Sequence, residues 1–216
     1  MSIVNFQVYQ IYFDALSKSK IDSGFIPYNN TGKNCHNYEN DIIKDVYLSH
    51  RKEWINKDYV GVLSWRFFDK SHLTALEFYK KIIATGSPVV SVKLGSNYRN
   101  CSHPYSRKQY PQILELCRVA DDHSLFDFKL LNRPIKNQIW CNYWVATPEV
   151  FELYCSKYLI KTMDFFANNK NKEVKDAYNL TLKHRDNKQT FAMTFFLEGL
   201  FSLFLQEEKI DVSQIA

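Results

Sequence analysis

The chain has 216 residues, of which 45% are hydrophobic and 16% aromatic, and its formal net charge is +5. This length and composition exclude a disordered chain and predict one folded domain over residues 1–216, which could be part of a longer polypeptide. The positive excess suits an anionic small-molecule ligand. It is too small and too scattered to indicate nucleic-acid binding.

Five cysteines are spread along the chain without C-x-x-C spacing. This pattern predicts free thiols in a reducing compartment, with neither a disulfide framework nor a structural zinc site. The amino terminus lacks the basic start and the cleavage site of a signal peptide, and no apolar run has the length of a membrane span. We therefore expect a cytoplasmic protein.

The first half of the chain alternates predicted strands with predicted helices. Runs of β-branched and aromatic residues predict strands over residues 4–13, 24–28, 59–63 and 89–94. Amphipathic spacing predicts helices over residues 41–54, with Asn40 as N-cap, and over 72–85, ended by Gly86. The polar segment 95–111 follows without clear periodicity, and a loop of that length is usually functional or mobile.

The second half continues this alternation. We expect a helix over residues 112–119, a strand over 139–145 and a helix from Thr147 to about Phe166. A polar linker at 168–172 then precedes a strongly apolar helix over 190–205. Strands that alternate with helices predict an α/β layered domain, with a central mostly parallel or mixed sheet flanked by helices.

A polar run follows the strand at 59–63 directly. It contains Ser64, Trp65, Arg66, Asp69 and Lys70. Because open α/β sheets bind ligands at the carboxyl ends of their strands, this run is a candidate ligand-facing edge. The alternative is a charged strand end at the surface.

Glu198 lies inside the apolar run Phe195–Phe201. Burial of a carboxylate is costly without a partner and raises its pKa, which suits a general base or an electrostatic stabiliser. The alternative is a helix carboxylate paired with a lysine or arginine.

Three aspartates are candidate ligands of a divalent cation. Asp121 and Asp122 stand beside His123, and Asp69 lies just past the strand edge. A solvated turn after the predicted helix explains Asp121 and Asp122 better than a metal site does.

Asn142 and Tyr143 offer an amide and an aromatic face that suit a sugar ring, although such residues are also common in cores. His103 in the long polar segment is a further candidate, or simply a solvated histidine.

Several common motifs are absent. The chain contains no G-x-G-x-x-G, no Walker loop, no G-x-S-x-G and no H-E-x-x-H, and it has six glycines in all. A bound nucleotide would therefore depend on side chains, strand ends and a metal ion.

Three segments together resemble GT-A fold glycosyltransferases of the capsular-polysaccharide type, including viral members that build a capsid glycan. The first is FIPYNNTG at 25–32, followed by a Glu-containing helix ending in Trp54 and by DYVGVLSWRFFDKS at 58–71. The others are IWCNYWVATPEVFELY at 139–154 and TFFLEGLFSLFL at 194–205.

This resemblance implies transfer of a sugar from a nucleotide diphosphate donor, expected to be UDP-linked, to a glycan hydroxyl, with Mn²⁺ or Mg²⁺ as cofactor. Ser64, Trp65 and Arg66 occupy the place of the family's Asp-x-Asp metal motif, and Glu198 matches the acidic residue of its closing helix. Two departures stand out. Residues 63–66 contain no carboxylate, so the metal ligand would be Asp69 or the Asp121–Asp122 pair. Gly199 replaces an arginine.

The mechanism expected on this basis places the donor base against the ends of the first two strands, at Gln10, Ile11, Tyr12 and Tyr28. A metal ion and Arg66 or Lys70 would offset the charge of the leaving diphosphate. Glu198 would deprotonate the acceptor hydroxyl or steady the sugar cation, with Asn142, Tyr143 and His103 near the acceptor.

Two other functions remain open. One is a carbohydrate- or nucleotide-binding module without turnover. The other is an RNA-binding or nuclease-like domain, which we disfavour because no basic stripe interleaves with the aromatic residues.

Overall fold

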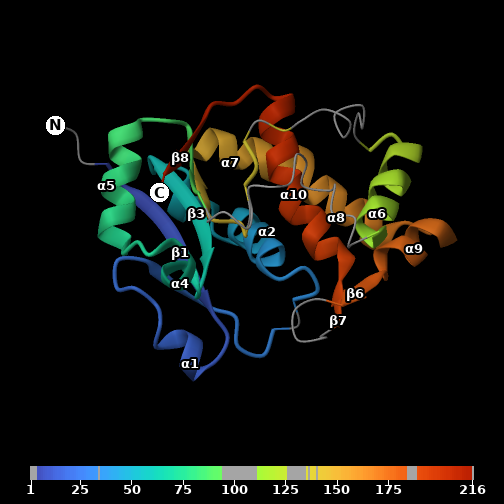
Figure 1. The fold of residues 1–216 in the computed structure, drawn as a ribbon, viewed down its shortest axis with the longest axis horizontal. Helices are drawn as coiled ribbons and strands as arrows, with labels where there is room; N and C mark the ends of the chain where they lie inside the picture. Colours follow the sequence, from blue (N-terminus) through green and yellow to red (C-terminus); the bar gives the residue numbers. More distant parts are fainter. Residues whose placement is uncertain are drawn as a thin grey trace.

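A computed structural model describes residues 4–33, 35–93, 111–125, 135, 137–139, 141–183 and 189–215. These residues form a six-stranded mixed sheet with helices on both faces (Figure 1). The predicted α/β class and the flanked mixed sheet are therefore confirmed.

The sheet has the strand order β2-β1-β3-β5-β4-β8. Its strands are β1 (Phe6–Tyr12), β2 (Ile26–Asn29), β3 (Tyr59–Ser64), β4 (Val89–Val92), β5 (Trp144–Ala146) and β8 (Val212–Ile215). Only β5 runs antiparallel to its neighbours β3 and β4 among these six. Every residue of β3 is buried, because helices cover both faces of the sheet, and this explains its continuous apolar sequence.

One face of the sheet packs against α4 (Phe67–Ser71) and α5 (Ala75–Thr85). Val8, Leu63 and Val145 point to this side, toward Phe78 and Ile82 of α5. Side chains alternate between the faces of a strand, so the neighbours of these residues face the other layer. Figure 1 shows α5 at the left of the molecule, on the outer side of the sheet.

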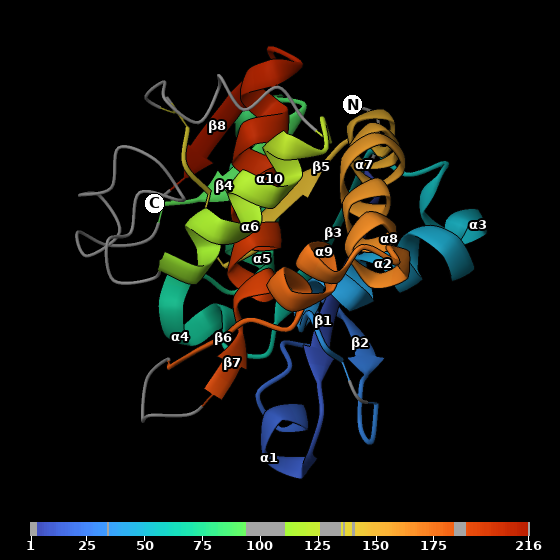
Figure 2. The same cartoon turned by 90° about the vertical axis from the view of Figure 1, so that its right-hand side faces the viewer.

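The opposite face carries the larger core. Its helices are α2 (Glu39–Ser49), α3 (Arg51–Trp54), α6 (Pro111–Asp122), α7 (Pro148–Tyr154), α8 (Ile160–Asn168), α9 (Lys172–Tyr178) and α10 (Ala192–Glu207). A π-helical turn, Cys155–Leu159, joins α7 to α8. Trp144 of β5 stacks on Phe201 of α10, with ring centroids 3.7 Å apart, so α10 lies directly on the sheet (Figure 2).

Several predicted boundaries were wrong. The helix expected over 41–54 starts at Glu39 and is split at His50, so Asn40 lies inside its first turn and does not cap it. The helix expected from His72 begins at Ala75, because Thr74 forms a capping box with Glu77.

The strand expected over 139–145 starts only at Trp144. Cys141 and Asn142 have φ angles of 64° and 52°, which no extended strand allows. The last helix starts at Ala192, since residues 189–191 form β7 of a small hairpin with β6 (Thr181–Lys183). α9 and β8 had not been predicted.

Gly61 is required by the close approach of β3 and β5. A Cβ atom at this position would lie 2.6 Å from Cγ1 of Val145 and 2.9 Å from the carbonyl oxygen of Trp144. No side chain fits there, which accounts for the single glycine within β3.

The carboxyl ends of β1 and β3 lie at the lower edge of the sheet in Figure 1. α1 (Ala15–Lys18), which follows β1, and α4, which follows β3, both lie below the sheet in that view. We call this side the carboxyl edge. In the part of the chain that is described, no helix combines the length and the apolar character needed to span a bilayer.

Candidate functional site

The end of β3 is tied to the segment before β5 by a buried hydroxyl pair. Ser64 Oγ and Tyr143 Oη lie 2.7 Å apart, and the Arg66 backbone N–H donates to Ser64 Oγ at 3.3 Å. Burial raises the pKa of Tyr143, so its hydroxyl stays protonated at neutral pH. Ser64 thus fixes the position where the polar run begins.

Lys70 reaches back from α4 to this same segment. Its Nζ lies 3.3 Å from Sγ of Cys141 and 5.2 Å from the centre of the Tyr143 ring. Burial, reinforced by the charge of Glu198, raises the pKa of the Cys141 thiol to about 12, although the Lys70 amine acts in the opposite direction. The thiol is therefore neutral.

Glu198 of α10 approaches from the other side of the segment. Its Oε1 accepts a hydrogen bond from the backbone N–H of Cys141. The left-handed conformation of Cys141 and Asn142 occurs in this turn, next to the bonded N–H group. Glu198 and Lys70, predicted from separate segments, thus meet at Cys141.

Glu39 is the site residue that sequence reasoning missed. It is the first residue of α2 and partly buried. Burial raises its pKa, the charge of Glu198 raises it further, and the charge of Lys70 lowers it. Two carboxylates and one amine therefore lie close together, from α2, α10 and α4. Glu39 precedes the helix predicted over residues 41–54, and no sequence pattern singled it out.

We expect Glu39→Gln to stabilise the protein at pH 8. The raised pKa means that ionised Glu39 costs folding free energy, in spite of its favourable place at a helix N-terminus. The gain should appear as a rise in melting temperature of roughly 2–4 °C per kcal/mol, and it should vanish near pH 4, where Glu39 is protonated in both states.

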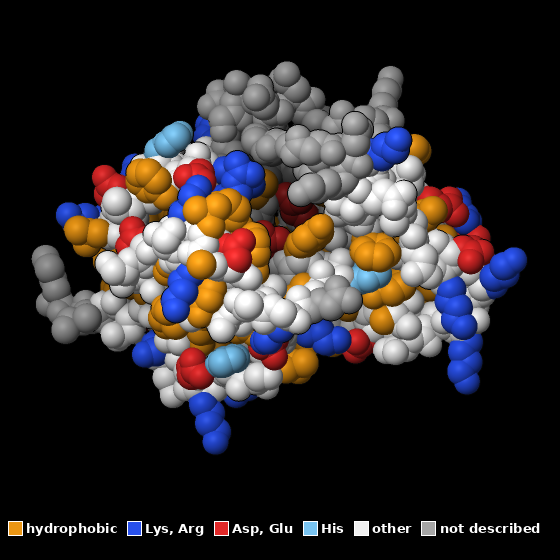
Figure 3. Space-filling model, turned by 90° about the horizontal axis from the view of Figure 1, so that it is seen from below, with side chains coloured by type: hydrophobic (Ala, Val, Ile, Leu, Met, Phe, Trp, Pro, Cys, Tyr) orange, Lys and Arg blue, Asp and Glu red, His pale blue; other side chains and the backbone are white. Residues whose placement is uncertain are grey.

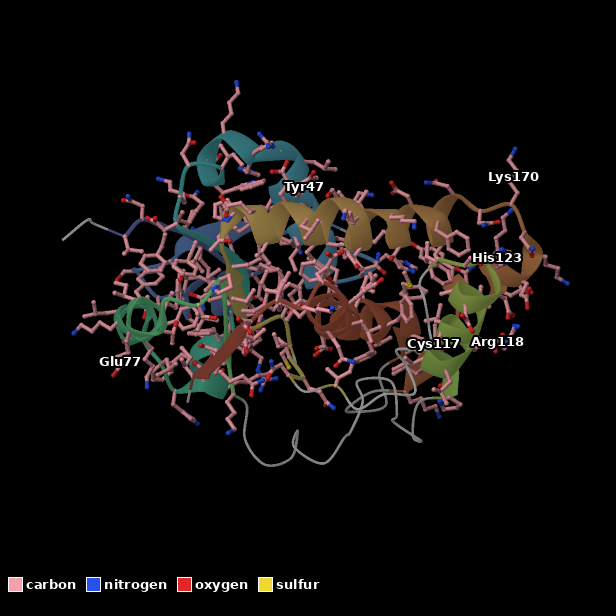
Figure 4. The ribbon with its side chains drawn as sticks, turned by 90° about the horizontal axis from the view of Figure 1, so that it is seen from above. Tyr47, Glu77, Cys117, Arg118, His123 and Lys170 are labelled. Atoms are coloured by element: carbon pink, nitrogen blue, oxygen red, sulfur yellow. The ribbon has the colours of Figure 1, made fainter. Side chains whose placement is uncertain are left out.

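Glu77→Gln on α5 is the matched control (Figure 4). Hydrogen bonds from Thr74 lower the pKa of Glu77, so its ionised form stabilises the fold and its replacement should lower the melting temperature at pH 8. A lower melting temperature for Glu39→Gln at pH 8 would show that Glu39 is an ordinary stabilising charge.

The carboxyl edge is hollowed. Figure 3, which looks at the molecule from below, shows a depression near the middle of this face with acidic side chains inside it. Glu39 and Glu198 are both partly exposed.

The residues expected to hold the donor base have other roles in this structure. Gln10 is buried, with Nε2 bonded to the carbonyl of Ser64 at 3.3 Å and Oε1 accepting from the N–H of Asp22 at 2.9 Å. Ile11 lies in the main core, and Tyr12 lies under Lys18, whose Nζ is 5.6 Å from the ring centre. Gln10 therefore joins β1 to β3 and has no free amide group for a base.

Tyr28 faces away from the Glu198 region. Its hydroxyl is bonded to the carboxylate of Asp45 on α2 and accepts from Lys33 Nζ at 3.1 Å. Tyr28 lines a separate pocket on the α2 side of the molecule.

Arg66 and Asp69 are exposed at the rim of the carboxyl edge, and Trp65 beside them is partly exposed. Lys20 Nζ lies 4.8 Å from the Trp65 ring centre and 3.1 Å from Oδ2 of Asp69. Arg66 also lies over Trp65, at 5.8 Å. Asp69 thus takes part in an exposed ion pair with Lys20.

Asp121 and Asp122 lie at the other end of the molecule. They belong to α6. Figure 4 labels Arg118 of this helix, and His123 just after its end, far from Glu77 of α5. Asp122 Oδ2 is 2.5 Å from Arg118 Nη1, and Arg118 also bridges to Glu115 and Glu173. The structure does not bring these aspartates to Asp69.

Within the described ranges, no three His, Cys, Asp or Glu side chains form a group that could hold a metal ion. Metal dependence therefore stays a prediction. His103 lies outside the described residues.

Asn142 and Tyr143 are 4% and 0% exposed. A fully buried ring has no face on which a sugar can stack, so Tyr143 supports Ser64 and Lys70 here. Its expected contact with a sugar ring would require the site to open.

No family model, curated protein or solved structure matches this chain. The resemblance to glycosyltransferases therefore rests on the sequence segments given above.

Proposed function

We propose that the chain is a GT-A type glycosyltransferase that moves a sugar from a UDP-linked donor to a glycan hydroxyl in the cytoplasm, that of the host if the protein is viral. The observation that supports this most strongly is the meeting of Glu198, Glu39 and Lys70 at the carboxyl edge. Acid–base groups concentrated at the ends of sheet strands are typical of enzymes of this architecture.

In this proposal Glu198 removes the proton from the acceptor hydroxyl. The Cys141 N–H holds Oε1 of the carboxylate, which leaves Oε2 for the acceptor. Burial and the neighbouring charge of Glu198 raise the pKa of Glu39, since two close carboxylates repel each other when both are ionised.

Lys70 and Arg66 offset the negative charge that grows on the leaving diphosphate. Lys70 is held by its contacts with Cys141 and Tyr143, whereas Arg66 is exposed at the rim and can reach outward. Ser64 and Tyr143 keep the end of β3 in place between these cations and the carboxylates.

The described residues at this edge do not make up a divalent metal site by themselves. Glu39, Glu198 and the Cys141 thiol lie together, and the sulfur of Cys141 accepts a hydrogen bond from Lys70. Asp69 is paired with Lys20 at the rim, and no group of three suitable ligands is found among the described residues. We therefore derive no step through a metal ion, and the test below includes Mn²⁺ as a separate arm.

The test is a thermal-shift titration with UDP, UDP-sugars and other nucleotides, each with and without Mn²⁺. A donor at 100 times its Kd should stabilise the fold by about 2.7 kcal/mol, roughly 5–10 °C for a chain of this size. A shift with UDP compounds supports the proposal.

The proposal is contradicted if no nucleotide changes the melting temperature, either with or without Mn²⁺. Binding of an oligonucleotide would then favour the RNA-binding alternative. Binding of saccharides without any nucleotide effect would favour a carbohydrate-binding module.

A further inference from the structure

A second pocket lies on the α2 side of the molecule. Its volume is about 510 Å³, within the range of roughly 300–1,000 Å³ found for small-molecule sites. It is bounded by α2, α8, α9 and the segment after β2. Asn37 and Asp41 line it, whereas Glu39 between them belongs to the Glu198 region, so the first turn of α2 separates the two sites.

The two lysines that line the pocket are each paired with a carboxylate. Lys44 Nζ lies 2.8 Å from Oδ1 of Asp164, and Lys33 Nζ lies 3.9 Å from Oδ2 of Asp45. Asp41 adds a third carboxylate, which accepts hydrogen bonds from the backbone and side-chain N–H groups of Asn37 at 2.8 and 3.1 Å. A phosphate group would have to displace a carboxylate from each lysine, so this chemistry disfavours an anionic ligand.

The remaining wall combines aromatic rings with hydrogen-bonding groups. His36 stacks on Tyr178, with ring centroids 4.8 Å apart, and burial lowers the pKa of His36, so the ring is mostly neutral at pH 7. Two buried atoms of the lining residues, Oδ1 of Asn37 and Nε2 of His36, have no hydrogen-bond partner among the described residues. Such atoms are costly unless a ligand or water satisfies them.

These features together fit a neutral ligand with many hydroxyl groups. A hydroxyl both donates and accepts, so it can bond to the carboxylates as well as to the tyrosines and lysines of the wall. His36 already stacks on both Tyr178 and Phe191, with ring centroids 4.8 and 3.5 Å apart, so hydrogen bonds would hold a saccharide here.

We propose that this pocket binds a neutral saccharide at a site separate from the Glu198 region. The site is a glycan-binding site in its own right, and it stands whether or not Glu198 supports sugar transfer.

The experiment measures saccharide binding by saturation-transfer NMR and calorimetry. The probes are the methyl glycosides of glucose, galactose and mannose, together with lactose and cellobiose. Concentrations of up to about 10 mM nearly saturate even a site whose binding free energy is only about −4 kcal/mol. We expect at least one of them to bind, and UDP not to displace it.

Two adjacent exposed positions of α8 provide the matched variants. Ala167 lines the pocket and Asn168 does not, so Ala167→Trp should fill the pocket while Asn168→Trp leaves it open. We expect the first to weaken binding at least tenfold, and we expect Asn168→Trp and Glu198→Gln to change it less than twofold. Circular dichroism checks the fold of each.

The proposal is overturned if none of these saccharides binds, or if Ala167→Trp binds as well as the parent. Displacement by UDP, or loss of binding in Glu198→Gln alone, would assign the saccharide to the Glu198 region and overturn it as well.

Discussion

Replacement of Glu198 by glutamine is expected to lower the rate of sugar transfer by about 10²–10⁴-fold, the usual contribution of a positioned general base. The glutamine side chain retains an oxygen that can accept the hydrogen bond from the Cys141 N–H, so the turn before β5 should keep its conformation. It cannot take up the proton of the acceptor. The rates of sugar transfer and of donor hydrolysis are measured from the release of UDP.

The affinity of the Glu198→Gln variant for the donor distinguishes a role of Glu198 as general base from a structural role. We expect the Kd for UDP, measured by calorimetry, to stay within about threefold of the parent, because the lost interaction belongs to the chemical step. Glu207→Gln, at an exposed position near the end of the same helix, serves as control. Unchanged turnover in Glu198→Gln would remove the proposed base.

Replacement of Lys70 by methionine is expected to destabilise the fold by roughly 1 kcal/mol at pH 8, because it leaves the partly buried carboxylates of Glu39 and Glu198 without a positive partner. Methionine keeps the length of the side chain but removes the charge beside Glu39 and Glu198. The pKa of Glu39 should then rise further above its usual value of 4.5. Melting temperatures measured between pH 4 and pH 8 test this.

The sign of the pH dependence follows from that shift. A carboxyl group whose pKa is higher in the folded state than in the unfolded state weakens the fold as the pH rises through these values. The difference between parent and Lys70→Met should therefore be small near pH 4 and largest at pH 8. Lys70→Arg keeps the charge and should behave like the parent. An equal loss at every pH would show that Lys70 matters only for packing.

Much of the sheet was predictable because its central strands are buried on both faces. Such strands are continuously apolar, and β1, β3 and β4 were identified from that pattern. The strand predicted over 139–145 was too long, because Cys141 and Asn142 have positive φ angles and nothing in the sequence around them indicates this. β8 is only partly buried, so its apolar signal is weak.

The candidate site was predictable where a charge interrupts an apolar run. Glu198 stands out for this reason, and Ser64 and Lys70 follow a buried strand. The other candidates depended on partners that sequence does not reveal. Gln10 is bonded at both ends of its amide, and Asp122 is bonded to Arg118. Glu39 escaped notice because its burial arises only when α2 meets α10.

The short length of β5 has a consequence for the sheet as a whole. Three residues of β5 join the parallel strands on one side, β2, β1 and β3, to β4 and β8 on the other. The turn held by Glu198 lies directly before this seam. A molecule that binds at the carboxyl edge and holds this turn should therefore also strengthen the pairing of β5 with β3 and β4. We expect the backbone amides of Val145 and Ala146 to exchange more slowly when such a molecule is bound.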